Sequence, residues 1–118
     1  MDSLNNNPTI LVVDDEPELC QALSRLLQRS DYNVLTAGDG EEAIEVLRDN
    51  DIPVVLTDLM MPRMGGVELL KAAKVVSPAT EVVIVTGHGT VETAVEAMKE
   101  GAYDFIEKPF TKAITLNT

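Results

Sequence analysis

Residues 10–15 read Ile10-Leu11-Val12-Val13-Asp14-Asp15, four aliphatic residues that stop at two acids. Three further runs stop in the same way, at side chains that can do chemistry: Val54-Val55-Leu56 at Thr57-Asp58, Val82-Val83-Ile84-Val85 at Thr86, and residues 103–106 before Lys108. Short aliphatic runs separated by helix-length amphipathic segments are typical of strands buried on both faces of a parallel sheet. The sequence therefore predicts an α/β fold.

The segments between these runs carry apolar residues at helical spacing. The expected strands cover residues 10–13, 34–37, 53–58, 81–85 and 103–106, and the expected helices cover 18–30, 41–49, 66–76 and 90–100. Pro17 can open the first helix, and Ser77-Pro78 can end the third. Repeated β–α alternation without an internal repeat predicts a doubly wound five-stranded parallel sheet. Only residues 111–118 remain for a fifth helix, so we expect that helix to be truncated.

Length and composition restrict the class of protein. The 118 residues suit one domain, expected over 9–118, after a disordered polar tail at 1–8. A net charge of −11 argues against direct binding to nucleic acid or to anionic membranes. Cys20 is the single cysteine, which excludes an internal disulfide and suggests a reducing compartment, so we expect a cytoplasmic protein. Its helical spacing among leucines favours a core thiol over a reactive one.

Three acids are expected to meet at one edge of the sheet, because the carboxyl ends of parallel strands lie together there. Asp14, Asp15 and Asp58 would repel one another by roughly 4 kcal/mol per close pair, so they need a cation or a proton. Mg²⁺ suits an all-oxygen set of this kind, whereas His88 stands alone as a ligand for other metals. The alternative is that Asp14 and Asp15 form only a solvated turn before a helix.

Asp58 can also act as a nucleophile. A carboxylate can attack a phosphoryl donor and hold the group as an acyl phosphate. The transferred group spreads its charge over equatorial oxygens, so the site must mainly neutralise and position it. The Thr86 hydroxyl and the Lys108 ammonium could each take one such oxygen.

Four motifs together resemble the receiver domains of two-component response regulators over about residues 9–110: Asp14-Asp15, Asp58-Leu-Met-Met-Pro, Thr86-Gly87 and Lys108-Pro109-Phe110. The resemblance implies a flavodoxin-like sheet of order 2-1-3-4-5. It also implies that Asp58 accepts the phosphoryl group, and that Mg²⁺ is held by Asp15 and Asp58, by Asp14 through water and by the Met60 carbonyl. Thr86 would bind the phosphoryl group and move toward it, Lys108 would pair with it, and Lys108-Pro109 would be a cis peptide.

Two positions depart from the commonest receiver pattern. Phe105 stands where receivers often carry a switch tyrosine; it can swing inward without a hydroxyl, or it can be a plain core residue. Gly65 stands where Asp or Ser often caps the third helix, a change that costs only about a few tenths of a kcal/mol. His88 is either a solvated loop residue or a group lining the mouth of the site.

The resemblance implies a signalling switch that promotes its own phosphorylation and dephosphorylation but is not a turnover enzyme. A sensor histidine kinase would donate to Asp58, and the face made by strand four, helix four and strand five would relay the signal to an effector domain. The stretch 86–110 looks especially like the receivers of sigma-54-dependent transcriptional activators. A homodimer of the chain is a further possible partner. The alternatives are a receiver-like scaffold that is never phosphorylated, a flavodoxin-like flavin binder and a haloacid-dehalogenase-type phosphatase. For the last, Asp14-x-Glu16 does not match the D-x-D spacing.

Overall fold

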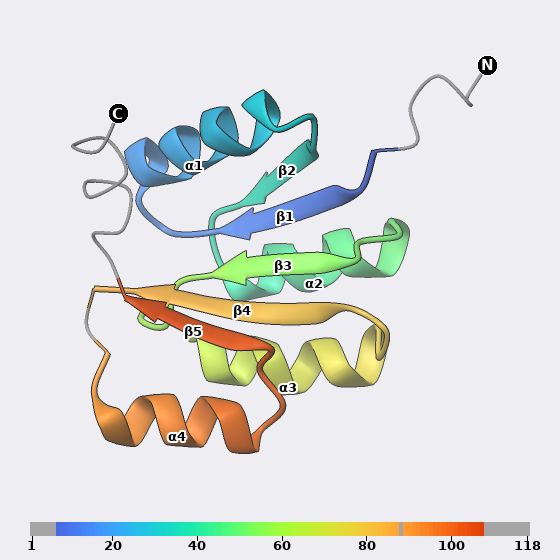
Figure 1. Cartoon of the computed structure of the whole chain (residues 1–118). Coiled ribbons are helices and arrows are strands. Elements are labelled where there is room, and N and C mark those ends of the chain that lie inside the picture. Colours follow the sequence, from blue (N-terminus) through green and yellow to red (C-terminus); the bar gives the residue numbers. More distant parts are fainter. Residues whose placement is uncertain (1–6, 88, 108–118) are drawn as a thin grey trace.

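The computed structural model of the chain describes residues 7–87 and 89–107, which form an alternating β/α sequence (Figure 1). The elements are β1 (Thr9–Val13), α1 (Pro17–Arg29), β2 (Asn33–Ala37), α2 (Gly40–Asp49), β3 (Val54–Thr57), α3 (Gly66–Val76), β4 (Glu81–Thr86), α4 (Val91–Lys99) and β5 (Asp104–Glu107). All paired strands are parallel, in the order β2-β1-β3-β4-β5. The predicted sheet order is confirmed.

Most element boundaries agree with the sequence prediction to within one residue. The bounds of α3 are as predicted, and α1 begins at Pro17, whose fixed φ suits the first helical position. The last strand begins one residue later than expected, at Asp104, although the Tyr103 N–H already bonds to the Val82 carbonyl at 2.8 Å. Residues 1–6 of the expected tail at 1–8, Lys108 and the expected short fifth helix lie outside the described residues, whereas the carbonyl of Pro8 accepts from the Asn33 N–H at 3.0 Å.

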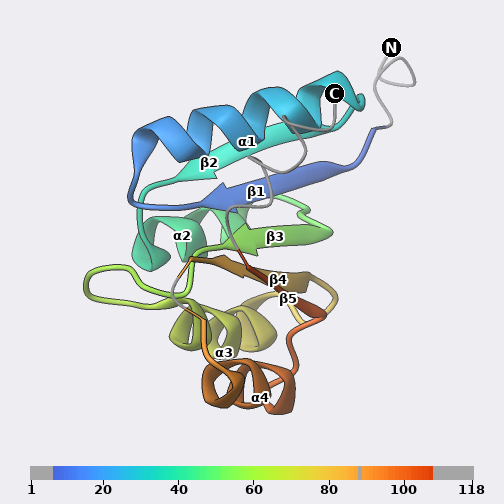
Figure 2. The same cartoon turned by 60° about the vertical axis from the view of Figure 1, so that its left-hand side comes forward.

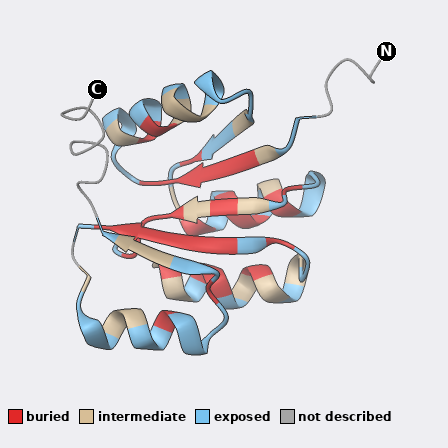
Figure 3. Cartoon of the chain, viewed as in Figure 1, coloured by how far each residue is buried: buried red, intermediate tan, exposed pale blue. Residues whose placement is uncertain are grey.

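The helices form two layers around the sheet. Figures 1 and 2 show α1 on one face and α2, α3 and α4 on the other, as a doubly wound sheet requires. The larger apolar cluster lies on the second face, built from alternate strand residues such as Leu11, Val55 and Ile84. The smaller cluster lies under α1 and includes Val12 and Cys20. Figure 3 shows β1 and β4 almost wholly buried, whereas β3 alternates between buried and half-buried residues. Among the described residues, no helix has the length and apolar content needed to cross a membrane.

The fourth helix is anchored differently from the others. Its only buried residue is Ala97, while Val91 is 81% exposed and Val95 and Met98 are each 48% exposed. The apolar spacing predicts the helix correctly, but the larger apolar side chains face solvent. A small residue buries little surface, so α4 gains less from packing than a helix anchored by leucines.

Candidate functional site

The strand register sets Asp14 and Asp58 side by side. Val13 pairs with Thr57 across β1 and β3, and each is followed directly by one of these acids. The backbone continues the pairing past both strands, since the Asp58 N–H donates to the Val13 carbonyl at 3.0 Å and the Asp14 N–H donates to the Ala37 carbonyl at 3.2 Å. Both acids therefore leave the sheet from fixed main-chain positions.

The structure brings together the three acids singled out in the sequence. Asp14, Asp15 and Asp58 each offer a carboxylate oxygen, and these oxygens all lie within 4.8 Å of one another. Asp14 and Asp58 are 4% and 6% exposed, whereas Asp15 faces solvent. Partly buried carboxylates at this separation repel one another unless a cation or proton is shared. An all-oxygen cluster open to water on one side fits Mg²⁺, which retains several water ligands.

Two backbone hydrogen bonds orient the buried carboxylates. Asp14 Oδ1 accepts from the Glu16 N–H at 2.9 Å, and Asp58 Oδ1 accepts from the Leu59 N–H at 2.7 Å. Both donors lie within two residues of their acceptor, so the turn after each strand fixes its own acid. Each bond holds its carboxylate in one direction, which suits a metal ligand and a nucleophile.

The start of α3 lies directly against the backbone of Asp58. A Cβ on Gly66 would come within 2.4 Å of the Asp58 carbonyl oxygen and 3.0 Å of Leu59 Cα. The Gly66 N–H donates to the Leu59 carbonyl at 2.9 Å and closes the loop on itself. Gly65 is the N-cap and offers no side chain, but its N–H donates to Glu68 Oε1 at 2.8 Å. Only glycine fits at position 66 without a shift of the Asp58 backbone. The sequence prediction did not include this residue, although the Gly65-Gly66 pair could have indicated a close approach of two backbones.

Thr86 and Phe105 are joined through the loop after β4. Thr86 is fully buried at the end of its strand, and Phe105 is half-buried against the larger apolar cluster. A Cβ on Gly89 would lie 2.6 Å from Phe105 Cε1 and 3.3 Å from Thr86 Cγ2. The phenyl ring and the Thr86 methyl group therefore both lie close to the backbone of Gly89 in this loop.

The remaining predicted residues are placed as follows. Met60 lies two residues after Asp58 and is 59% exposed. Because its thioether is a soft ligand and Mg²⁺ prefers oxygen, only its backbone carbonyl is a reasonable ligand. Met61 turns back toward β3, where its sulfur lies 3.9 Å from Thr57 Oγ1. Lys108 and His88 lie outside the described residues.

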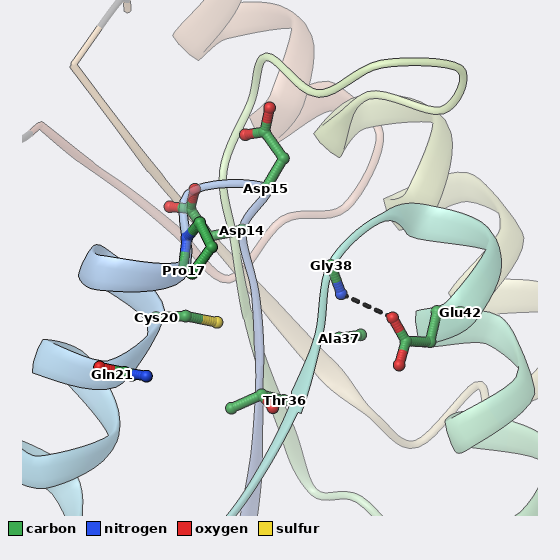
Figure 4. A pocket seen from close by; sticks show the side chains of 9 residues that line it. All are labelled: Asp14, Asp15, Pro17, Cys20, Gln21, Thr36, Ala37, Gly38 and Glu42. Carbon is green, nitrogen blue, oxygen red and sulfur yellow. Dashed lines mark hydrogen bonds between the residues drawn. The ribbon is translucent and has the colours of Figure 1, made fainter.

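A cavity of about 340 Å³ opens beside the acids, between α1 and the β2–α2 turn (Figure 4). Its wall includes Asp14, Cys20, Thr36 and Glu42, and Glu42 Oε1 accepts from the Gly38 N–H at 2.8 Å. Burial, followed by the nearby charge of Asp14, raises the pKa of the Cys20 thiol. The thiol is buried and therefore not poised for reaction, in line with its interpretation as a core residue.

Comparison with known sequences gives a consistent result. The family model described as "Response regulator receiver domain" matches residues 10–117. The transcriptional regulatory protein ZraR of Escherichia coli K12 is 44% identical over 105 residues, which cover 89% of this chain and 24% of that protein. The nitrogen assimilation regulatory protein NtrX of Azorhizobium caulinodans is 41% identical over 103 residues, which cover 86% of this chain and 23% of that protein. The chain thus spans about a quarter of the length of these curated relatives.

Solved structures agree with these relatives. The beryllofluoride-activated NtrC4 receiver domain dimer superposes with a TM-score of 0.83 at 41% identity, covering 93% of this chain and 91% of that one. The alignment extends over nearly the whole of both chains, so the similarity is not confined to a shared motif.

Proposed function

Because this chain belongs to the response regulator receiver domain family of two-component systems, we propose that it is a Mg²⁺-dependent phosphoacceptor switch in which Asp58 receives the phosphoryl group of a sensor histidine kinase. The observation that carries the proposal is the convergence of Asp14, Asp15 and Asp58 within 4.8 Å. A scaffold that is never phosphorylated has no need to hold three mutually repelling acids at one edge of its sheet.

Mg²⁺ would be held by the carboxylates of Asp15 and Asp58, by Asp14 through water and by the Met60 carbonyl. When bound, the ion would neutralise the acids and offset the charge of the incoming phosphoryl oxygens. The donor set supports this assignment, since carboxylate, carbonyl and water oxygens are the ligands that Mg²⁺ prefers.

The chemical step belongs to Asp58. One carboxylate oxygen attacks phosphorus and forms a P–O bond, while the bond from phosphorus to the donor nitrogen breaks and the imidazole leaves with that electron pair. The bond from the Leu59 N–H holds the nucleophile in one orientation during this step. Thr86 and Lys108 would bind phosphoryl oxygens, and the chain would promote its own phosphorylation without acting as a turnover enzyme.

The switch would then act through the packing around Thr86. Movement of Thr86 toward the phosphoryl group opens space beside Gly89 that the Phe105 ring can enter, and α4 adjoins this loop. Output would leave through the exposed residues of α4, to an effector domain that the relatives suggest is a transcriptional regulator. The sequence of residues 86–110 favours a sigma-54-dependent activator. The NtrC4 receiver is a dimer when beryllofluoride-activated, which supports a homodimer of this chain on activation.

Incubation with acetyl phosphate and Mg²⁺ should add one phosphoryl group to the chain, measured by intact-protein mass spectrometry. Chelation of the metal before the donor is added should prevent the mass increase, because three unneutralised carboxylates repel an anionic donor. No increase in the presence of Mg²⁺ would favour the unphosphorylated scaffold. A coloured, flavin-containing preparation would instead favour the flavin binder.

Thr86→Ala should separate loading of the site from the response of α4. Beryllofluoride with Mg²⁺ should still perturb the amide NMR signals around Asp58, but those of residues 91–99 should shift much less than in the wild type. The physical reason is that a ligand shifts an equilibrium only through contacts that differ between the two states. Thr80→Ala is the matched control, since it removes the same atoms from a buried threonine just before β4. A full α4 response in Thr86→Ala would exclude the hydroxyl from the coupling.

A further inference from the structure

The loop between β3 and α3 is attached at its outer end to the start of α2. The Arg63 guanidinium donates to the carboxylate of Asp39, and Arg63 Nε lies 3.7 Å from Glu41 Oε1. Next to it the Met64 side chain fills the space beside Gly40, where a Cβ would come within 2.6 Å of the sulfur. Two ionic contacts and one apolar contact therefore join this loop to the start of a neighbouring helix.

The backbone at Arg63 is unusual. Its φ is +67°, a value that residues other than glycine rarely adopt. The Met64 N–H donates to the Pro62 carbonyl at 2.7 Å, which closes a three-residue turn centred on Arg63. Such strained conformations persist only where the surrounding contacts over-determine them. Arg63 supplies two such contacts itself, from its guanidinium to Asp39 and to Glu41.

Asp39 is a rigid anchor for this contact. It is the N-cap of α2, and its Oδ1 accepts from the Glu42 N–H at 2.9 Å. That hydrogen bond, with a smaller contribution from Arg63, lowers the pKa of Asp39. The carboxylate is therefore charged at neutral pH and fixed in direction by the helix that it caps.

We propose that Arg63 is a positioning residue for the magnesium site: by tying the loop to the start of α2, it holds the Met60 backbone carbonyl in place as a ligand. The inference rests on the proposed function, in which Met60 supplies the ligand that comes from loop backbone. The stem of the loop is fixed by the bonds of Leu59 with Asp58 and Gly66. Met60 lies between that stem and the Arg63 attachment, so both ends of the short segment that carries the carbonyl are restrained.

Arg63→Ala should weaken Mg²⁺ binding about two- to fivefold, the range that the loss of an exposed ion pair allows. The measurement is a Mg²⁺ titration of the whole chain, followed by amide NMR at about 0.15 M salt, where distant charges are screened. The direction of the change in Mg²⁺ affinity is decisive. Removing a positive charge near an acidic site would by itself tighten cation binding, so weaker binding reports lost positioning. Arg48→Ala removes the same charge from the other end of α2 and should not weaken the binding.

Three further variants separate positioning from general stability. Asp39→Asn keeps an N-cap residue but removes the negative charge. The double variant Asp39→Asn/Arg63→Ala should bind Mg²⁺ no more weakly than Arg63→Ala alone, because the two residues share one contact. Arg63→Gly relieves the positive φ, so its melting temperature should not fall although its Mg²⁺ affinity does. Arg63→Lys should restore part of the affinity. An Arg63→Ala affinity equal to or above that of the wild type would overturn the inference, whereas a wild type that binds no Mg²⁺ would overturn the proposed function instead.

Discussion

Asp58→Asn should abolish the phosphoryl mass increase that acetyl phosphate and Mg²⁺ produce in the wild type. The amide is not a nucleophile of comparable strength, and the substitution also removes one carboxylate from the cluster of three. The fold should survive, because Asn has the same shape and its oxygen can still accept from the Leu59 N–H. Less repulsion among the acids should leave its thermal stability equal to or above that of the wild type.

The control for this experiment is Asp51→Asn, which makes the same chemical change at an exposed acid before β3. It should be labelled as the wild type is. Residual labelling of Asp58→Asn at the wild-type level would remove Asp58 from the role of phosphoacceptor, and peptide mapping would then identify the residue that carries the group.

Gly66→Ala should lower both stability and labelling. The added methyl group meets backbone atoms, the Asp58 carbonyl oxygen at 2.4 Å and Leu59 Cα at 3.0 Å, and backbone cannot rotate out of the way as a side chain can. Overpacking of this kind typically costs about 1 to 3 kcal/mol of the free energy of unfolding. Since the shift falls on the residue that carries the nucleophile, the rate of labelling should fall more than the folded fraction does.

Gly38→Ala is the matched control, because a Cβ there would meet only Glu42 Oε1 at 3.6 Å, an ordinary contact. Denaturant unfolding followed by circular dichroism would give the stability of both variants, and labelling rates would be compared under conditions where each is folded. Equal stability and equal rates in Gly66→Ala and Gly38→Ala would contradict the close approach of α3 to the Asp58 backbone.

The sequence was sufficient to predict the sheet, since a strand buried on both faces must be almost wholly aliphatic and few other elements look like β1 or β4. The proximity of Asp14 and Asp58 could also be predicted from the sequence, because the carboxyl ends of parallel strands lie at one edge of the sheet. The helix boundaries followed to within one residue from the apolar spacing, with Pro17 at the start of α1 and Ser77-Pro78 at the end of α3.

Contacts between loops could not be predicted in the same way. The pairing of Arg63 with Asp39 depends on how two turns 24 residues apart fold over one another, and nothing in the spacing of those residues indicates it. The orientation of α4 did not follow from its apolar spacing either, although the resemblance to receiver domains implied an exposed output face on this helix. Its valines and methionine have the spacing of a buried stripe, yet the helix turns Ala97 toward the core, a choice that depends on the neighbouring elements and not on the helix itself.

The exposure of α4 affects the fraction of molecules that adopt the active arrangement in the absence of a signal. With Ala97 as its only buried residue, the helix would lose little packing by moving to a second arrangement. A free-energy gap of about 1.4 kcal/mol between two arrangements leaves roughly one molecule in ten in the minor one. We therefore expect a signalling protein of this kind to respond to a weak stimulus, but also to show measurable output when no stimulus is present. The stimulus needed for a response should depend on which surface covers Val91, Val95 and Met98 in the full protein.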